Sequence, residues 1–303
     1  MPVIAVPSPR GKEEIRRGLV IDPAAEHDFT MQMQAEQFDL ALQLQDAGEY
    51  SNSFLRAFAP RYLVGLKSAN AAPLDHWIPY LHYQNEVVRA LEVVGLAGAS
   101  LSSDRLLPHL NLLDKDYSDA APIVEQLHRP FAVLHPGSTD PRRCWSPQKF
   151  AEVGDFLAAS GFSILLTGTS IESGRVNAVA EAMRAPVINL CGRLGLLGLA
   201  GLLAQAALFV GNDTGPLHLA LAVGAKAVGL FWAEYIVNSL PLTRVTFYPL
   251  IAWQRTCPGC GAFLIKKEID HPSGSCAHGY SMLEEIGSAD VIRGVKALIA
   301  SAR

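Results

Sequence analysis

The chain has 303 residues, of which 50% are hydrophobic and 18% charged, and this length and composition predict two globular domains with buried cores. A disordered or fibrous protein is excluded. The net charge of −4, without a long run of Lys or Arg, argues against a nucleic-acid partner. Five cysteines, an odd number, and an N-terminal stretch without the apolar core of a signal peptide predict a reduced, cytoplasmic protein.

Residues 1–120 are expected to form a smaller α/β domain. FDLALQLQD at 38–46 and YLVGLKS at 62–68 have the composition of strands, and residues 83–94 carry apolar side chains at helical spacing. The opening VIAVPSPRGKEEI predicts only a weak strand and turn. Residues 114–130 are interpreted as a polar linker with a short helix.

A regular alternation of strand-like and helix-like patterns fills residues 131–255. The apolar runs are short, nearly continuous and end in Gly or polar turns: FAVLHPG, SILLTG, VINLCG, LFVGND and AVGLFW. Such runs are typical of strands buried on both faces of a parallel sheet, so a doubly wound α/β domain is predicted. Because ligands bind at the carboxyl ends of such strands, four turns are of interest: HPGST (135–139), TGTS (167–170), CGRLG (191–195) and NDTGP (212–216).

The uncharged stretch 194–211 has the length of a minimal membrane span. Gly195, Gly198, Gly201 and Gln205 dilute its hydrophobicity, and its last third has strand composition and runs into a polar turn. We therefore predict a buried helix followed by a buried strand.

The segment VGNDTGPLHLALAVG places an acid, a hydroxyl, a glycine and an imidazole where a strand is predicted to become a helix. The strand would carry Asp213 to the sheet edge, Gly215 would let a ligand approach the backbone, and the helix would offer N–H groups and a partial positive charge. Capping by Asp213 or Thr214 is the alternative, but a cap requires neither the glycine nor His218. The pattern predicts an anion site.

HPGSTDPRRCW repeats this arrangement with more positive charge. A strand end is followed by Gly137, two hydroxyls, Arg142 and Arg143, and paired guanidiniums beside such a turn suit a diphosphate. The alternative is a solvated Arg pair on a surface loop. Neither segment contains GxGxxG or GxxxxGK[ST], which disfavours a nicotinamide enzyme and a P-loop NTPase.

Taken in order, these motifs resemble the C-terminal domain of glycosyltransferase family 9, which contains the ADP-heptose:lipopolysaccharide heptosyltransferases. The resemblance is carried by HPGS with the following RCW, ILLTG, INLCG, the leucine-rich helix, FVGNDTGPLHLALAVG and AVGLFW, and more weakly by FDLALQLQ and RYLVGL. It implies a GT-B type architecture of two Rossmann-like doubly wound domains, the N-terminal one incomplete here. The C-terminal domain would hold the donor nucleotide-sugar.

The resemblance also implies site residues and partners. The positions that match donor-binding positions of the family are Ser138, Asp213, Thr214, Gly215 and His218, together with Arg143, where relatives commonly have Lys. It implies an inverting, metal-independent glycosyltransferase that requires no cofactor. The donor would be a nucleotide-sugar such as ADP-heptose, and the acceptor a lipopolysaccharide or related lipid-linked envelope glycan. The protein would work in the cytoplasm, with peripheral contact to the inner face of the membrane.

Family relatives begin with a strand and a GD turn, whose Asp is thought to be the general base, and this segment is expected to be missing here. Among the acids of the N-terminal part, Asp22, Asp28 and Asp46 are considered as substitutes, and Asp46, which follows a predicted strand, is the best of them. The alternative is a catalytically inactive nucleotide-sugar-binding remnant without the base. A GT-B epimerase is the weaker third interpretation, because its acids and His cannot be assigned.

Residues 256–303 are expected to form a Cys-rich loop and a terminal helix from about 289 to 300. Cys257 and Cys260, separated by two residues, are followed by Cys276 and His278. Three thiols and an imidazole can form a tetrahedral zinc site, and four protein ligands would make it structural. A loop of buried thiols is the alternative.

Overall fold

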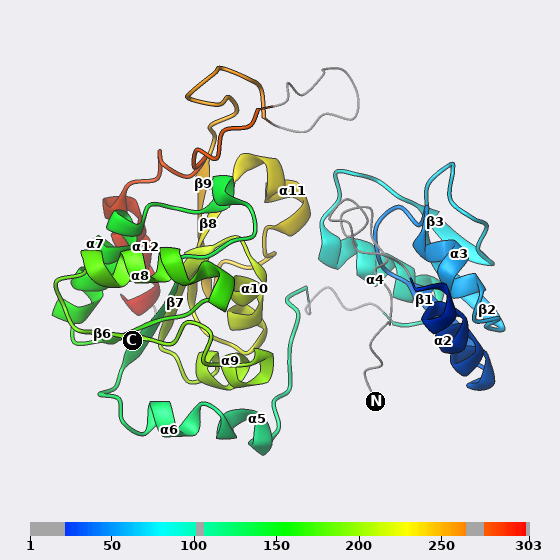
Figure 1. Ribbon diagram of the computed structural model, residues 1–303, viewed down its shortest axis with the longest axis horizontal. Coiled ribbons are helices and arrows are strands. Elements are labelled where there is room, and N and C mark those ends of the chain that lie inside the picture. The colour runs from blue at the N-terminus through cyan, green and yellow to red at the C-terminus, as the bar shows by residue number, and fades with distance from the viewer. Residues whose placement is uncertain (1–21, 101–105, 265–275, 301–303) are drawn as a thin grey trace. The chain divides into compact units, whose positions relative to one another are not determined.

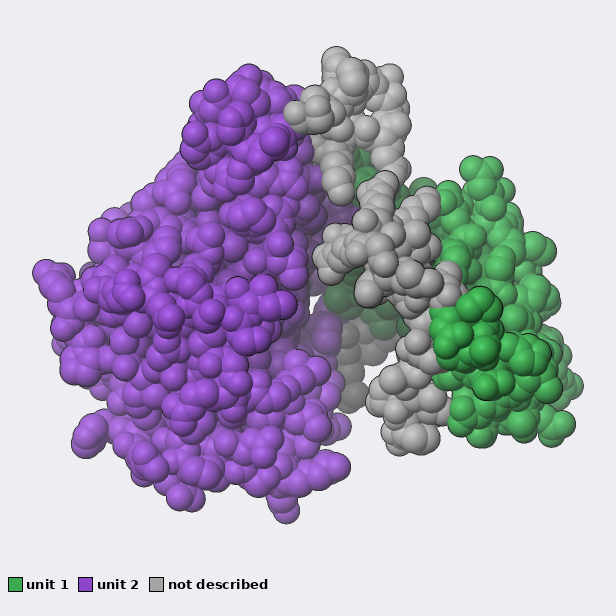
Figure 2. Space-filling model, viewed as in Figure 1, with its two compact units in different colours: residues 1–104 green, residues 105–303 purple. Residues whose placement is uncertain are grey.

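The computed structural model describes residues 22–100, 106–264 and 276–300. The chain divides into two compact units, residues 1–104 and 105–303, which are called unit 1 and unit 2 here (Figure 2). The weak strand and turn predicted for the opening VIAVPSPRGKEEI lie outside the described residues.

Unit 1 contains a three-stranded parallel sheet in the order β1-β2-β3, formed by β1 (Leu40–Gln43), β2 (Tyr62–Lys67) and β3 (His76–Pro79). The strands predicted at 38–46 and 62–68 are confirmed. The sequence analysis did not predict β3, because it is short and mostly exposed and so lacks an apolar pattern.

In the described part of unit 1, three helices accompany this sheet: α2 (Pro23–Ala35), α3 (Ser51–Arg56) and α4 (Glu86–Leu96) (Figure 1). The helix predicted over 83–94 is confirmed as α4, which starts after the N-cap Asn85. The carboxylate of Asp22 caps α2 by accepting hydrogen bonds from the N–H groups of Ala24 and Ala25, and Pro23 occupies the first turn.

Unit 2 contains a six-stranded, fully parallel sheet in the order β6-β5-β4-β7-β8-β9, which confirms the predicted doubly wound domain. Its strands are β4 (Phe131–His135), β5 (Ser163–Leu166), β6 (Val187–Asn189), β7 (Leu208–Asn212), β8 (Ala227–Trp232) and β9 (Phe247–Ala252). Every residue of β4, β7 and β8 is buried, as expected of strands covered on both faces.

Helices cover both faces of this sheet and create two cores (Figure 1). One core lies under α7 (Pro147–Ala159), α8 (Ser173–Ala182) and α12 (Ser288–Ala300). The other lies under α9 (Leu196–Leu203) and α10 (Gly215–Ala222). In the strands other than β6, side chains alternate between the two cores; in β4, for example, Ala132 and Leu134 enter the first core and Phe131 and Val133 the second.

The segment 114–130 is helical in part, as predicted, but it packs on unit 2 and is not a polar linker. It forms the short helices α5 (Asp114–Ser118) and α6 (Ala121–Val124). The buried side chains of Ala120, between the two helices, and Val124 belong to the second core of unit 2. Helix α9 packs closely on α5, because a Cβ added to Gly201 would lie 2.2 Å from the carbonyl oxygen of Asp116. Most polar residues of this segment are exposed, and Asp116 is the buried exception. Because polar residues dominate the segment, the sequence analysis did not recognise its buried apolar side.

Residues 194–211 form α9 and β7, as the sequence analysis predicted. In the described part of the chain, no helix combines the length and apolar character that a membrane span requires.

The strand order reverses between β4 and β7, so their crossover helices lie on opposite faces of the sheet. In open α/β sheets this is the place where the loops after the strands separate and leave a crevice for a ligand. The segments HPGST and NDTGP follow these two strands, so the topology brings the predicted site residues together.

Candidate functional site

A buried amide holds together the two loops at the point where the strand order reverses. Asn212, the last residue of β7, is fully buried and donates from Nδ2 to the carbonyl oxygens of Pro136 (2.9 Å) and Gly137 (3.1 Å). Its Oδ1 accepts from the N–H of Trp145 at 3.2 Å. Each polar atom of the Asn212 side chain therefore has a backbone partner, and this fixes HPGST against NDTGP.

Asp213 lies at the centre of a polar network. Its carboxylate is nearly inaccessible, with 4% of the side chain exposed. Oδ1 lies 3.2 Å from Nε2 of His218, and Oδ2 accepts from Nη2 of Arg143 and from Oγ of Ser239, both at 2.9 Å. The same Nη2 also donates to the carbonyl oxygen of Asp213. Asp213 thus orients a guanidinium and an imidazole.

Arg143 is enclosed on a second side by an aromatic ring. Its guanidinium lies over Tyr235, 4.4 Å from the ring centre, which is within the range of a cation–π contact. Burial and the nearby Glu234 raise the pKa of the Tyr235 phenol, so the ring stays uncharged beside the cation. The neighbouring Arg142 makes a different pair, with Asp140 at 2.6 Å.

Helix α10 begins at this site, with Thr214 as its N-cap residue. The Thr214 hydroxyl bonds to the carbonyl oxygen of Asn212 at 3.3 Å and does not cap the helix. Pro216 has no N–H group, and the N–H of Leu217 donates to the Thr214 carbonyl at 3.0 Å. The helix therefore offers fewer N–H groups than the sequence analysis expected. A Cβ added to Gly215 would have no atom within 4 Å, so space is open above the backbone.

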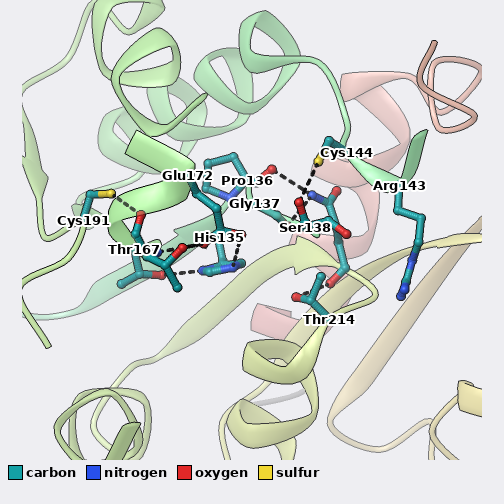
Figure 3. Close-up of polar contacts among 12 residues, drawn as sticks. His135, Pro136, Gly137, Ser138, Arg143, Cys144, Thr167, Glu172, Cys191 and Thr214 are labelled. Carbon is teal, nitrogen blue, oxygen red and sulfur yellow. Dashed lines mark hydrogen bonds and ion pairs between the residues drawn. The ribbon is translucent and has the colours of Figure 1, made fainter. Parts of the chain in front are cut away.

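A second polar cluster lies at the ends of β4 and β5 (Figure 3). The buried ring of His135 approaches the Thr167 hydroxyl with Nδ1 (3.1 Å) and the Glu172 carboxylate with Nε2 (3.9 Å). Burial lowers the pKa of His135, and the charge of Glu172 opposes this only in part, so the ring is neutral at physiological pH. Gly137 makes room for Glu172, because a Cβ there would lie 2.0 Å from Oε1.

Two cavities open beside the cluster of His135, Thr167 and Glu172 and share Thr169 in their walls. One, which we call the polar cavity, has a volume of about 390 Å³, and its lining includes the polar side chains of Ser138, Glu172 and Arg175. The other, of about 460 Å³, is bounded mainly by apolar side chains: Leu190, Leu194, Leu196, Leu199 and Pro216. A polar cavity next to an apolar one suits a ligand with a charged part and a planar apolar part.

The structure brings together Arg143, Asp213 and His218, three of the predicted site residues, in one network, with Thr214 and Gly215 at the adjoining helix start. Ser138 lines the polar cavity. The sequence analysis did not select His135, Glu172, Tyr235 or Ser239 as site residues. His135 ends β4 and Glu172 lies shortly after β5, so the rule that ligands bind at strand ends points to both, whereas Tyr235 and Ser239 lie in a turn after β8 that has no recognisable pattern.

Asp46 lies in the turn after β1, with φ 47° and an exposed side chain. Its Oδ1 accepts from the N–H of Gly48 at 2.8 Å and lies 3.5 Å from Oγ of Ser51. These are the contacts of an acid that stabilises a tight turn. Asp28 is an exposed residue of α2.

The four predicted metal ligands lie together in the loop after β9. The ligand atoms of Cys257, Cys260, Cys276 and His278 all lie within 4.8 Å of one another. Cys260 Sγ is 3.5 Å from Cys276 Sγ, and His278 Nδ1 is 3.7 Å from Cys257 Sγ and 3.5 Å from Cys276 Sγ. Ligand atoms around a tetrahedral zinc lie roughly 3.5–3.8 Å apart, as follows from Zn–S and Zn–N bonds of about 2.3 and 2.1 Å. The donor set therefore fits such an ion.

The backbone of this loop supports the Cys257 thiolate. Burial alone would raise the pKa of Cys257, but N–H groups of Cys260 and Gly259 and the neighbouring thiols bond to its sulfur and lower the pKa to about 7. Gly261 has φ 71° and returns its N–H to the carbonyl oxygen of Cys257 at 2.8 Å, which closes the turn. A metal would find one ligand already deprotonated near neutral pH.

Solved structures show the class of fold to which the chain belongs, the GT-B type of glycosyltransferases. A glycosyltransferase family 9 protein from Veillonella parvula matches with a TM-score of 0.72 and 16% identity, over 91% of this chain and 78% of that one. Escherichia coli ADP-heptose lipopolysaccharide heptosyltransferase II matches with a TM-score of 0.68 and 18% identity, over 91% and 81%. Identities this low support the fold alone.

The family follows from the sequence. The model of glycosyltransferase family 9 (heptosyltransferase) matches residues 27–244, and the chain belongs to this family. Lipopolysaccharide heptosyltransferase 3 of Escherichia coli is 32% identical over 106 residues, which are 34% of this chain and 31% of that protein. Lipooligosaccharide heptosyltransferase 2 of Haemophilus influenzae is 27% identical over 108 residues, again 34% and 31%. The chain thus aligns with about a third of the length of these curated relatives.

Proposed function

We propose that the chain transfers a sugar, a heptose, from an ADP-linked donor to a lipopolysaccharide or related cell-envelope glycan. The network of Arg143, Asp213 and His218 beside the start of α10 carries this proposal, because it presents cationic and hydrogen-bonding groups where the strand order reverses. The names of the relatives support the substrates: they are lipopolysaccharide heptosyltransferases, and one similar solved heptosyltransferase holds ADP.

The reaction is an inverting displacement. The acceptor hydroxyl attacks the anomeric carbon, the bond from that carbon to the diphosphate breaks on the opposite face, and the hydroxyl proton passes to a base. Arg143, His218 and the Gly215 N–H stabilise the charge that develops on the departing diphosphate. Asp213, with both carboxylate oxygens engaged, acts by holding Arg143 and His218 in place.

The two neighbouring cavities bind different parts of the nucleotide-sugar in this proposal. The planar base enters the 460 Å³ cavity, where leucine side chains can cover its faces. The polar cavity with Ser138 receives part of the phosphate and sugar. No cofactor takes part in this scheme, because stabilisation of the leaving group comes from the side chains of the network.

Asp46 is the proposed general base of unit 1. It follows a strand of a parallel sheet, where ligands of such sheets bind, and its carboxylate is exposed. If Asp46 accepts the proton of the acceptor hydroxyl, Asp46→Asn lowers kcat at least about a hundredfold and leaves donor affinity unchanged. A variant with wild-type kcat would exclude this role.

The Cys257, Cys260, Cys276 and His278 cluster is proposed to hold a structural zinc ion. All four ligands come from the protein, so no position is open for a substrate, and the ion would stabilise the loop. Elemental analysis of the purified chain is expected to give one equivalent of a thiophilic metal. Protein without metal would leave a cluster of free thiols.

Calorimetric titration with ADP, UDP and GDP tests the donor site. We expect selective binding of ADP that is lost in Asp213→Asn, because the variant leaves Arg143 and His218 without their anionic partner. Asp140→Asn is the matched control, since it makes the same change in the neighbouring Asp140–Arg142 pair. If the wild-type chain binds none of the three nucleotides, the proposal fails. Binding without sugar transfer would identify a nucleotide-sugar-binding protein that is not an enzyme.

A further inference from the structure

The turn that follows β8 reaches the same network from a third side. It consists of a 3-10 turn (Ala233–Tyr235) and α11 (Ile236–Ser239), and we call residues 233–239 the β8 turn. Its sequence AEYIVNS matches none of the motifs that carry the predicted donor site, yet two of its side chains contact the site directly.

Ser239 supplies one of the hydrogen bonds to the buried carboxylate. Its Oγ lies 2.9 Å from Oδ2 of Asp213 and also 2.9 Å from the carbonyl oxygen of Tyr235. A hydroxyl has a single proton to donate, and the charged carboxylate is the stronger acceptor. Ser239 thus shares Oδ2 with Arg143 and fixes the rotation of the carboxylate about its last bond.

Tyr235 restrains Arg143, the other side chain that contacts Oδ2 of Asp213. The guanidinium of Arg143 lies over the Tyr235 ring, 4.4 Å from its centre, and donates a hydrogen bond to the Asp213 carboxylate. The ring is itself held by an edge contact with the fully buried Trp232, at 5.9 Å between centres. A long flexible Arg side chain that is fixed in this way loses less conformational entropy when it binds a phosphate group.

We propose that Tyr235 and Ser239 are positioning residues of the donor site, which orient Arg143 and Asp213 for the diphosphate of the donor. This inference rests on the proposed function and extends the site to the end of a third strand. Neither side chain needs to touch the nucleotide. Their effect reaches the ligand through Arg143, and this distinguishes them from residues that only stabilise the fold.

Nucleotide affinity tests the proposal, with ADP as the probe, or whichever of ADP, UDP and GDP the wild-type chain binds. Tyr235→Leu and Ser239→Ala are each expected to weaken binding about five- to tenfold, from the loss of a cation–π contact and of a hydrogen bond to a charged group. Tyr235→Phe retains the ring and restores the affinity. Val237→Ala, at a half-exposed position of the same turn, controls for a general effect of changing this turn.

A double-mutant cycle separates positioning from structural stabilisation. In an Arg143→Gln background, Tyr235→Leu is expected to cause no further loss of affinity, because the group that it orients is gone. A loss that is the same with and without Arg143 would overturn the proposal, as would wild-type affinity in both Tyr235→Leu and Ser239→Ala. If the wild-type chain binds no nucleotide, the proposed function fails first and this inference with it. Binding is compared only among variants with wild-type circular dichroism.

Discussion

Replacing Gly137 with Ala tests how the β4 loop and the start of α8 depend on each other. The added methyl carbon would lie 2.0 Å from Oε1 and 2.3 Å from Cδ of Glu172, well inside van der Waals contact, so the carboxylate must move by about 1 Å or more. In its present place, Oε2 accepts hydrogen bonds from the N–H (2.7 Å) and the hydroxyl (2.9 Å) of Thr169.

Losing these two hydrogen bonds costs about 2 kcal/mol, at about 1 kcal/mol each. For a unit of this size we expect the melting temperature to fall by about 4–8 °C in thermal unfolding followed by circular dichroism. Gly174→Ala is the matched control, because it lines the same cavity, has no atom within 4 Å of the added methyl and lies in α8, where Ala favours the helix. If Gly137→Ala melts like the wild-type chain, Glu172 is not held in this place.

Three further predictions concern the sites. Gly215→Ala adds a methyl group to open space, so the melting temperature of the variant should equal that of the wild-type chain. Its ADP affinity in calorimetry should fall about ten- to hundredfold, because ligand and methyl group would overlap. An ADP affinity equal to that of the wild-type chain would mean that no ligand approaches this backbone. His135 has a pKa below its ordinary 6.5, so the unfolded chain binds its proton more tightly and stability falls as the pH drops below 6.5. In urea unfolding at pH 7.5 and 5.5, His135→Gln should show a smaller difference than the wild-type chain, and an unchanged difference would contradict a neutral buried ring. Because Cys257 is one of four proposed ligands, Cys257→Ser should contain far less than the one equivalent of metal expected in the wild-type chain, as measured by elemental analysis. A full equivalent of metal in Cys257→Ser would remove this residue from the ligand set.

The buried parallel sheet of unit 2 could be predicted from sequence because each strand is a short apolar run followed by a polar turn. The same regularity predicted the position of Asp213 and Arg143 at neighbouring strand ends. What the sequence did not reveal is that the Asp213 carboxylate is enclosed, because its partner Ser239 comes from a turn without a recognisable pattern. Long-range pairs of this kind depend on strand order, which periodicity does not specify.

Unit 1 was harder to predict for a different reason. Its strands are short and partly exposed, so the apolar signal is weak, and β3 carries almost none. Three of the metal ligands were easier to select, because cysteine is rare and its spacing is informative even where the intervening loop has no periodic pattern.

The Asn212 amide has a consequence for engineering the donor site. Because one side chain satisfies carbonyl groups of the β4 loop and an N–H near the start of α7, these loops form a single exchangeable module. A graft in which Asn212 is replaced would leave the buried carbonyl groups of Pro136 and Gly137 without this donor. Altered donor preference should therefore be sought by exchanging both loops together and retaining Asn212, because its amide hydrogen-bonds the two loops to each other.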